Sequence, residues 1–378
     1  MHLTRSAIAL CLCFSASGGV AAPFESVEAL GEALFHDENL SLNRTQSCAT
    51  CHDPDVAFVD PRTTDAGRAV SLGDDGVSLG GRNSPTASYA AFVPEFDREW
   101  DGDAEGGLFW DGRADTLEEQ AGGPPLNPVE MGMPDKASVV SRLKANPDYV
   151  VSMEALFSPG VLEDAEAGYA AMTQAIAAFE RTDVFAPFDS KYDRYLRGEV
   201  TLSKEEELGR VLFFSEQFTN CAECHQLRRS QTHPQETFSN YEYHNIGVPV
   251  NSVLQEVLGE KGFVDKGLLD NPDVKKTKHM GKFRTPTLRN VAVTGPYMHN
   301  GAFEDLRTVV LFYNKYNSKD PKRQINPETG EVWKAPEVAH SLSVEELTEG
   351  PALDDQRIDA LVAFMKTLTD ARYEHLLE

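Results

Sequence analysis

The strongest constraint on the fold is a five-residue pattern, Cys-X-X-Cys-His, that occurs at residues 48–52 and again at 221–225. This pattern is typical of c-type haem attachment: two thiols bond to the haem vinyl groups, and the next imidazole binds the iron. Four thiolates would also suit a zinc site or two reduced pairs, but the two trailing histidines would then be coincidental. We therefore expect two covalent haems, held by Cys48, Cys51, His52, Cys221, Cys224 and His225.

The first 22 residues read as a signal peptide that is removed after Ala22. His2 and Arg5 precede a short apolar run, and small residues follow it, as in secretory leaders. The run is too short to span a bilayer, and we find no other candidate for a membrane span. We expect a soluble protein that is periplasmic or otherwise exported.

The net charge and the hydrophobic content of the chain exclude some classes of partner and of fold. Among 378 residues, 60 acidic and 35 basic side chains give a net charge of −25, which disfavours binding to nucleic acid. The 41% hydrophobic content excludes a disordered chain and is sufficient for one large or two medium domains.

The two haem patterns lie inside a longer internal repeat. A short amphipathic segment precedes each pattern, at 30–35 and 208–213. An arginine-containing turn follows each one, at 82–86 and 284–287, and then a glycine turn opens a helix at Gly112 and at Gly301. We expect a mainly α fold with long structured loops, made by duplication of a cytochrome c-like domain. The predicted domains are 23–197 and 198–378, and the C-terminal helix could pack back on the first domain.

Apolar periodicity predicts further helices, and strand-like alternation is scarce. Ser203 begins a Ser-Lys-Glu-Glu capping box, which marks the start of one of these helices. The expected helices are 139–143, 169–181, 204–214, 306–313 and 358–368.

The chain resembles the bacterial di-haem cytochrome c peroxidase family, and more narrowly its MauG branch. Besides the haem patterns, the resemblance rests on Gln120 and on the segments 109–113, 127–132, 284–290 and 295–299. It implies that one haem meets hydrogen peroxide while the other passes electrons.

The sequence supports this division of labour between the haems. No histidine occurs between His52 and His225, so the first haem has no second imidazole from its own domain. Twelve residues after Gly301 comes Tyr313, whereas twelve residues after Gly112 comes Pro124, whose ring cannot bind iron. We expect an open first haem and a second haem capped by Tyr313.

Two other assignments remain open for the second haem, because Tyr313 could be a core aromatic with Met280 or Met298 as the ligand. The resemblance implies a methionine at this place in typical peroxidases and a tyrosine in the MauG branch. Tyr313 therefore favours the MauG branch.

Peroxide cleavage needs a group that moves a proton between the two oxygens. Glu130 is the candidate acid–base and Gln120 the candidate hydrogen-bond donor, because they flank Pro124 and Glu130 matches the catalytic glutamate of the family. A lone glutamate in an acidic protein is otherwise usually a solvated charge.

The resemblance implies two further features between the domains. Trp110 matches an inter-haem tryptophan that would relay electrons, although core packing is the usual place of a tryptophan. A calcium ion would take oxygen ligands from the Asn83 side chain and from the Thr294 and Pro296 carbonyls.

One position departs from MauG, which carries a surface tryptophan two residues before the second haem pattern. Here that residue is Thr219, beside Phe218. Three function classes follow. They are a MauG-like oxidase of residues in a partner protein, a peroxidase fed by a small cytochrome or cupredoxin, and a non-enzymatic electron carrier.

Overall fold

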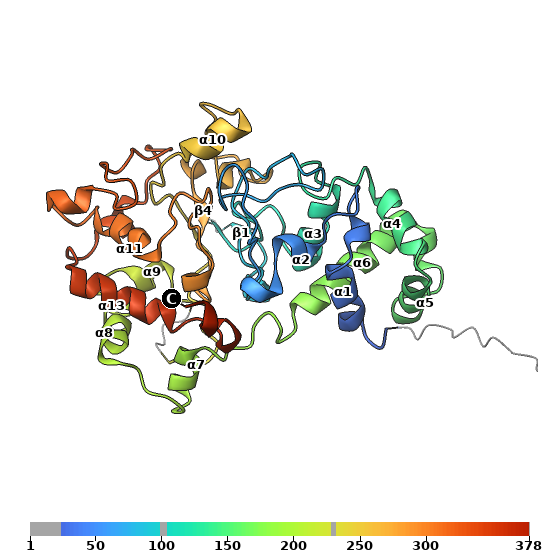
Figure 1. The fold of residues 1–378 in the computed structure, drawn as a ribbon, viewed down its shortest axis with the longest axis horizontal. Coiled ribbons are helices and arrows are strands. Elements are labelled where there is room, and N and C mark those ends of the chain that lie inside the picture. The colour runs from blue at the N-terminus through green and yellow to red at the C-terminus, as the bar shows by residue number, and fades with distance from the viewer. Residues whose placement is uncertain (1–23, 99–103, 228–231, 378) are drawn as a thin grey trace, which may run out of the picture.

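A computed structural model describes residues 24–98, 104–227 and 232–377. The predicted signal peptide, residues 1–22, lies outside these ranges. The described chain is mainly helical, as predicted, and its two halves lie side by side along the long axis of the molecule (Figure 1). Within the described residues no helix is both long and apolar enough to cross a bilayer.

The first half contains six α-helices among its described residues, joined by long loops (Figure 1). They are α1 (Val27–Phe35), α2 (Cys48–Cys51), α3 (Leu117–Ala121), α4 (Lys136–Lys144), α5 (Pro147–Leu156) and α6 (Ala165–Glu180). The short helix α7 (Lys191–Leu196) lies with the second half, where Tyr192 belongs to the buried core (Figure 1). The second half follows with α8 (Lys204–Phe213), α9 (Cys221–Cys224), α10 (Ser252–Leu258), α11 (Leu306–Asn314), α12 (Val344–Thr348) and α13 (Asp355–Lys366).

Among the described residues, the named strands form two short antiparallel pairs. Strands β1 (Asp97–Arg98) and β2 (Ala104–Glu105) pair with each other, as do β3 (Tyr243–His244) and β4 (Phe283–Arg284). Short 3₁₀ helices lie within the loops at Glu38–Leu40, Pro54–Val56, Ala90–Phe92, Pro124–Leu126, Val161–Glu163, Leu268–Asp270, Thr277–His279, Val291–Val293, Pro321–Gln324 and Ala371–Leu376.

A close helix crossing organises each half. Helix α1 packs on α6 so closely that a Cβ on Gly31 would lie 1.9 Å from the Ala175 carbonyl oxygen. Helix α8 packs on α13 in the same way, and a Cβ on Gly209 would lie 1.8 Å from the Ala360 carbonyl oxygen. Only glycine lets the two backbones meet at these points.

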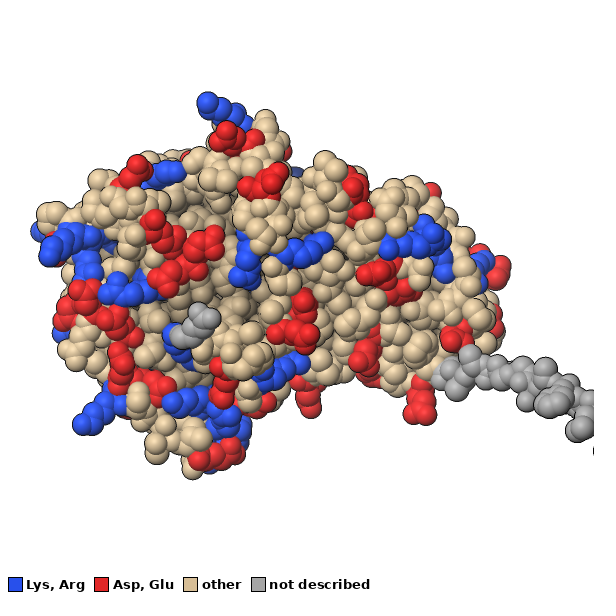
Figure 2. Space-filling model, in the orientation of Figure 1, with Lys and Arg blue, Asp and Glu red and all other residues tan. Residues whose placement is uncertain are grey.

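Each half has its own buried core. Phe35, Phe58 and Phe179 belong to the first, and Phe213, Phe238 and Phe364 belong to the second. Acidic and basic side chains are interspersed on the face shown in Figure 2, so neither sign dominates it.

The chain that follows α13 touches the first half. The Tyr89 hydroxyl donates to the Asp370 carboxylate at 2.5 Å, and the Tyr373 hydroxyl donates to the Pro54 carbonyl at 2.8 Å. Helix α13 itself packs against α8 and α11 of the second half.

The helix starts follow the capping residues. Ser203 forms the expected capping box with Glu206, and α8 begins directly after it. Helix α6 begins at Ala165, a turn before the expected start at Tyr169, because the Asp164 side chain accepts from the Ala167 N–H. That first turn contains mostly small residues, which carry little apolar periodicity.

Candidate active site with two haem attachment sites

The first haem pattern forms the short helix α2, which begins after Ser47. His52 ends this helix, and its Nδ1 lies 3.1 Å from the Phe58 carbonyl oxygen. A carbonyl only accepts, so Nδ1 carries the proton and the Nε2 lone pair remains available for iron. Burial lowers the pKa of His52, which also favours the neutral ligand form.

The second pattern repeats this arrangement. Cys221 and Cys224 bound helix α9, and His225 Nδ1 lies 3.1 Å from the Phe238 carbonyl oxygen. Burial lowers the pKa of His225 to about 4. The four cysteines of the two patterns are partly buried and form no disulfide, so their thiols are available for haem attachment.

A cavity of about 230 Å³ lies beside the second pattern, and mostly apolar side chains line it. Cys221, Cys224 and His225 face it together with Tyr313, which comes from α11. Burial and the two nearby thiols raise the pKa of Tyr313. Two thiols, an imidazole and a phenol that meet in one apolar space fit a c-type haem with two axial ligands.

The two methionine alternatives for the second haem differ in position. Met298 lines this cavity, whereas Met280 is not among the described residues that do. The cavity therefore brings Tyr313 and Met298 near His225, and the ligand assignment to Tyr313 stays a prediction.

The predicted peroxide-side residues lie at the end of one helix and in the compact loop that follows it. Gln120 lies in α3, and Pro124 begins the following 3₁₀ helix. The Pro124 carbonyl accepts from the Asn127 and Met131 N–H groups, both at 3.2 Å, which closes the loop that carries Glu130. The Glu130 carbonyl in turn accepts from the Asp74 N–H at 2.7 Å.

The Glu130 carboxyl lies close to the first haem pattern. Its negative charge contributes to the raised pKa of Cys51. Burial raises the pKa of Glu130 itself, and the positive charge of Arg113 and a hydrogen bond from Asn127 partly oppose this. A carboxyl with a raised pKa beside the attachment site is suited to hold and release a proton.

Trp110 joins the two halves. Its Nε1 donates to the Asn83 carbonyl at 2.8 Å, and its own carbonyl accepts from the Arg284 N–H at 3.1 Å. The ring also lines the second-half cavity. This position suits a relay between two haems, and the relay role stays a prediction.

The three proposed calcium ligands lie together. Asn83, Thr294 and Pro296 line one small pocket, which Asp60 also lines. The Asn83 amide nitrogen is 3.3 Å from the Ala69 carbonyl, which leaves its Oδ1 for another partner. Residues from two segments line this pocket, oxygen ligands are what a hard cation requires, and calcium binding stays a prediction.

The position at which the resemblance to MauG implies a surface tryptophan is buried in this chain. Thr219 is 6% exposed and its hydroxyl donates to the Leu212 carbonyl at 2.5 Å, whereas Phe218 is 42% exposed. Both residues line the second-half cavity.

The structure adds site residues that the sequence did not indicate. Phe58 and Phe238 supply the carbonyls that orient the two histidines. Arg62 lies with its Nη2 3.2 Å from the Cys51 sulfur and also pairs with Asp60. No common spacing in the sequence could have indicated the first two, because Phe58 follows His52 by six residues and Phe238 follows His225 by thirteen.

Comparisons with known proteins agree with this geometry. The family model described as "Di-haem cytochrome c peroxidase" matches residues 25–201. The methylamine utilization protein MauG of Paracoccus denitrificans is 56% identical over 94% of this chain and 91% of its own length. The cytochrome c peroxidase Ccp of Escherichia coli is 32% identical over 76% of this chain and 53% of its own length.

Solved structures give the same result. The crystal structure of the diheme peroxidase BthA from Burkholderia thailandensis has a TM-score of 0.82 and 34% identity, and the match covers 94% of this chain and 89% of that one. The family model and the solved structure are described as di-haem peroxidases, and the Escherichia coli relative is named a peroxidase, so the two attachment sites match that class. The chain is therefore a peroxide-dependent di-haem oxidoreductase that belongs to the di-haem cytochrome c peroxidase family, on its MauG branch.

Proposed function

We propose that this enzyme is a MauG-like oxidase, which takes oxidising equivalents from hydrogen peroxide at its first haem and delivers them through its second haem to residues of a partner protein. The observation that carries the proposal is the phenol of Tyr313 in the same cavity as His225. A phenolate ligand favours oxidised iron, whereas a thioether favours reduced iron.

Bound haem supplies the iron that reacts with peroxide in one half and the iron that exchanges electrons in the other. His52 and His225 would each hold an iron through Nε2. Glu130 would move a proton between the two peroxide oxygens, and Gln120 would donate a hydrogen bond to them. Pro124 would offer no ligand to the first haem, because its ring has no ligand atom.

Trp110 relays electrons between the halves in this proposal. Its contacts with Asn83 and Arg284, one from each half, support that role. Calcium, held by Asn83, Thr294 and Pro296, would fix the same junction from the adjacent pocket.

We further infer that the halves arose by duplication, with domains 23–197 and 198–378, and that residues 1–22 direct export to the periplasm. The paired helix crossings at Gly31 and Gly209 support the duplication. The paired carbonyl contacts of His52 and His225 support it independently.

The second candidate is a peroxidase that reduces peroxide to water with electrons from a small cytochrome or cupredoxin. Met298 favours it, because this thioether lines the same cavity as Tyr313. The electron-carrier alternative is set aside, because the matching family is described as a peroxidase family and the Escherichia coli relative is named a peroxidase.

Adding peroxide to the fully oxidised protein separates the two candidates. With Tyr313 as ligand, the protein should react without prior reduction and then accept two electrons per molecule from an added reductant. Tyr313→Met is the matched control and should require reduction first. A wild-type protein that is inert to peroxide until it is half reduced would refute the MauG-like proposal and leave the peroxidase.

A further inference from the structure

The two carbonyls that orient the haem-binding histidines come from strained residues. Phe58 has φ 56° and Phe238 has φ 57°, in the left-handed region that phenylalanine rarely adopts. Such a conformation persists only where the surrounding structure holds it, and it often marks a functional position. Each carbonyl therefore needs support from neighbouring groups to stay under its histidine.

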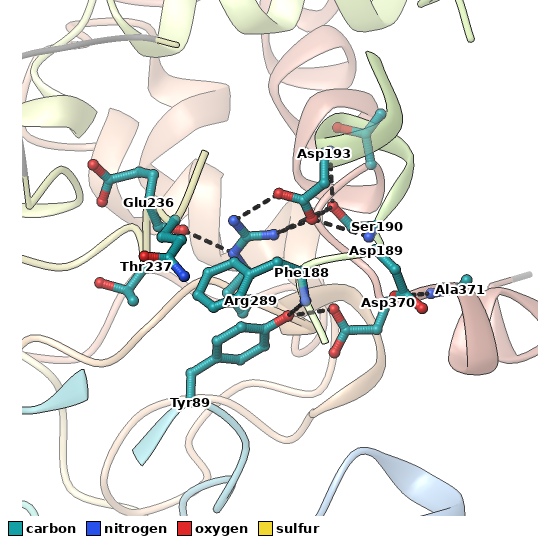
Figure 3. Close-up of polar contacts among 12 residues, drawn as sticks. Tyr89, Phe188, Asp189, Ser190, Asp193, Glu236, Thr237, Arg289, Asp370 and Ala371 are labelled. Atoms are coloured by element: carbon teal, nitrogen blue, oxygen red, sulfur yellow. Dashed lines mark hydrogen bonds and ion pairs between the residues drawn. The ribbon is translucent and has the colours of Figure 1, made fainter. Parts of the chain in front are cut away.

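In the second half, a buried arginine provides this support (Figure 3). Arg289 Nε donates to the Glu236 carbonyl at 2.8 Å, two residues before Phe238. The guanidinium carbon also lies 5.3 Å from the centroid of the Phe238 ring. One side chain thus holds both the backbone and the ring of the segment that contains the carbonyl.

The arginine is itself fixed. Its Nη1 and Nη2 donate to the two Asp193 carboxylate oxygens at 2.5 and 3.0 Å, and its side chain is fully buried. Because all three guanidinium nitrogens, Nη1, Nη2 and Nε, donate hydrogen bonds, the side chain has one available orientation. Thr287 adds a second support, since its hydroxyl donates to the Thr237 carbonyl at 2.6 Å.

The first half has the threonine support but lacks the arginine. Thr86 corresponds to Thr287, and its hydroxyl donates to the Ala57 carbonyl at 2.6 Å. Ser88 stands where Arg289 stands in the second half, and its buried Oγ has no hydrogen-bond partner. An arginine does lie near the first carbonyl, since the Arg372 guanidinium carbon is 5.2 Å from the centroid of the Phe58 ring, but it donates to the Val184 carbonyl and not to the segment that precedes Phe58. Among the described residues, the difference between the halves is therefore the hydrogen bond from Arg289 to the Glu236 carbonyl.

We propose that Arg289 is a positioning residue for the second haem: it holds the Phe238 carbonyl as the acceptor of the His225 Nδ1 proton. A well-placed acceptor makes the imidazole a stronger electron donor and so favours oxidised iron. This inference rests on the proposed function, since it takes His225 as the ligand of the second haem.

The test is Arg289→Lys in the di-haem protein, which keeps the positive charge but loses the donor to Glu236. We expect the midpoint potential of the second haem to rise and that of the first haem to stay unchanged. We also expect the His225 Nδ1 proton, followed by NMR of the low-spin haem, to exchange with solvent about tenfold faster.

Three further variants complete the test. Thr287→Val removes the second support without touching a charge and should shift the potential of the second haem in the same direction. If Arg289→Lys fails to fold, Thr287→Val tests the proposal in its place. Thr86→Val is its first-half counterpart and should affect His52 alone.

Tyr89→Phe controls for a purely structural effect. It removes the buried bond to Asp370 in the same network but none of the Arg289 contacts, so it should lower stability without changing either potential.

The outcomes are distinct. An unchanged potential and an unchanged His225 proton in both Arg289→Lys and Thr287→Val would overturn the proposal. An equal shift in Tyr89→Phe would also overturn it. The proposed function fails separately, and before any variant is made, if the wild-type protein does not show two haems with His225 bound to one of them.

Discussion

Glu180 should make the stability of the protein depend on pH. It is the last residue of α6 and only 6% exposed, and its Oε2 has no hydrogen-bond partner. Burial raises the pKa of this carboxyl from 4.5 to about 8, although Arg181 opposes the rise. In the corresponding crossing of the second half, the residue after Phe364 is Met365, an apolar side chain.

The size and sign of the effect follow from proton linkage. Between pH 4.5 and about 8 the folded protein keeps a proton on Glu180 that the unfolded chain has lost. The free energy of unfolding therefore falls as pH rises through this window. The stabilising contribution of the protonated Glu180 carboxyl is fully present only below pH 4.5. The total loss is about 4–5 kcal/mol, from about 1.36 kcal/mol for each pKa unit.

Glu180→Gln keeps the shape of the neutral carboxyl and cannot ionise. We expect denaturant unfolding of the di-haem protein, from about pH 5 to about pH 9, to show that the free energy of unfolding of the variant increases relative to that of the wild type as pH rises. Glu166→Gln changes an exposed carboxylate of the same helix and should leave the wild-type pH profile in place. Parallel profiles for Glu180→Gln and the wild type would refute the assignment of a buried, protonated Glu180.

Three other predictions concern the haem ligand, the acid–base group and the helix crossing. Tyr313→Phe should convert the low-spin haem signal to high spin in the electron paramagnetic resonance spectrum, and an unchanged signal would exclude Tyr313 as ligand. Glu130→Gln should slow the reaction with peroxide by about 10²–10⁴ in stopped flow while both haem spectra stay intact, and unchanged kinetics would remove Glu130 from the mechanism. Gly209→Ala would place a Cβ 1.8 Å from the Ala360 carbonyl oxygen and should cost at least about 1–3 kcal/mol in thermal unfolding, whereas Gly81→Ala, with no atom within 4 Å, should be neutral.

The sequence was sufficient for features that local chemistry determines. The two haem patterns need five adjacent residues each, and the structure shows both as a short helix that ends at the histidine. The capping box at Ser203 is equally local, and it places the start of α8 correctly. Helix α11 carries Tyr313 because Asp305 caps it and its apolar periodicity runs to the end.

Features that depend on the approach of distant segments could not be predicted. Arg289 and Asp193 are 96 residues apart, and no pattern in the sequence indicates that either residue is buried. Glu180 follows Phe179 on a helix that packs on both sides, so periodicity alone did not mark its carboxyl as enclosed. The Phe58 and Phe238 carbonyls are backbone groups, and their role depends on φ values that phenylalanine seldom adopts.

The differences between the matched halves explain how one architecture can support two kinds of haem chemistry. The shared contacts, at Gly31 and Gly209 and at the two histidines, concern the framework and are independent of the reaction. The residues that bear on reactivity stand where the halves differ. Pro124 corresponds to Tyr313 in the repeat, and Ser88 corresponds to Arg289. The second half thereby has a phenol in its cavity and a guanidinium bonded to the backbone behind its histidine. In the proposed assignments, both residues would donate electron density toward the same iron and stabilise its oxidised form. They would act together, so a variant that exchanged only one of them should move the potential of the second haem part of the way toward that of the first.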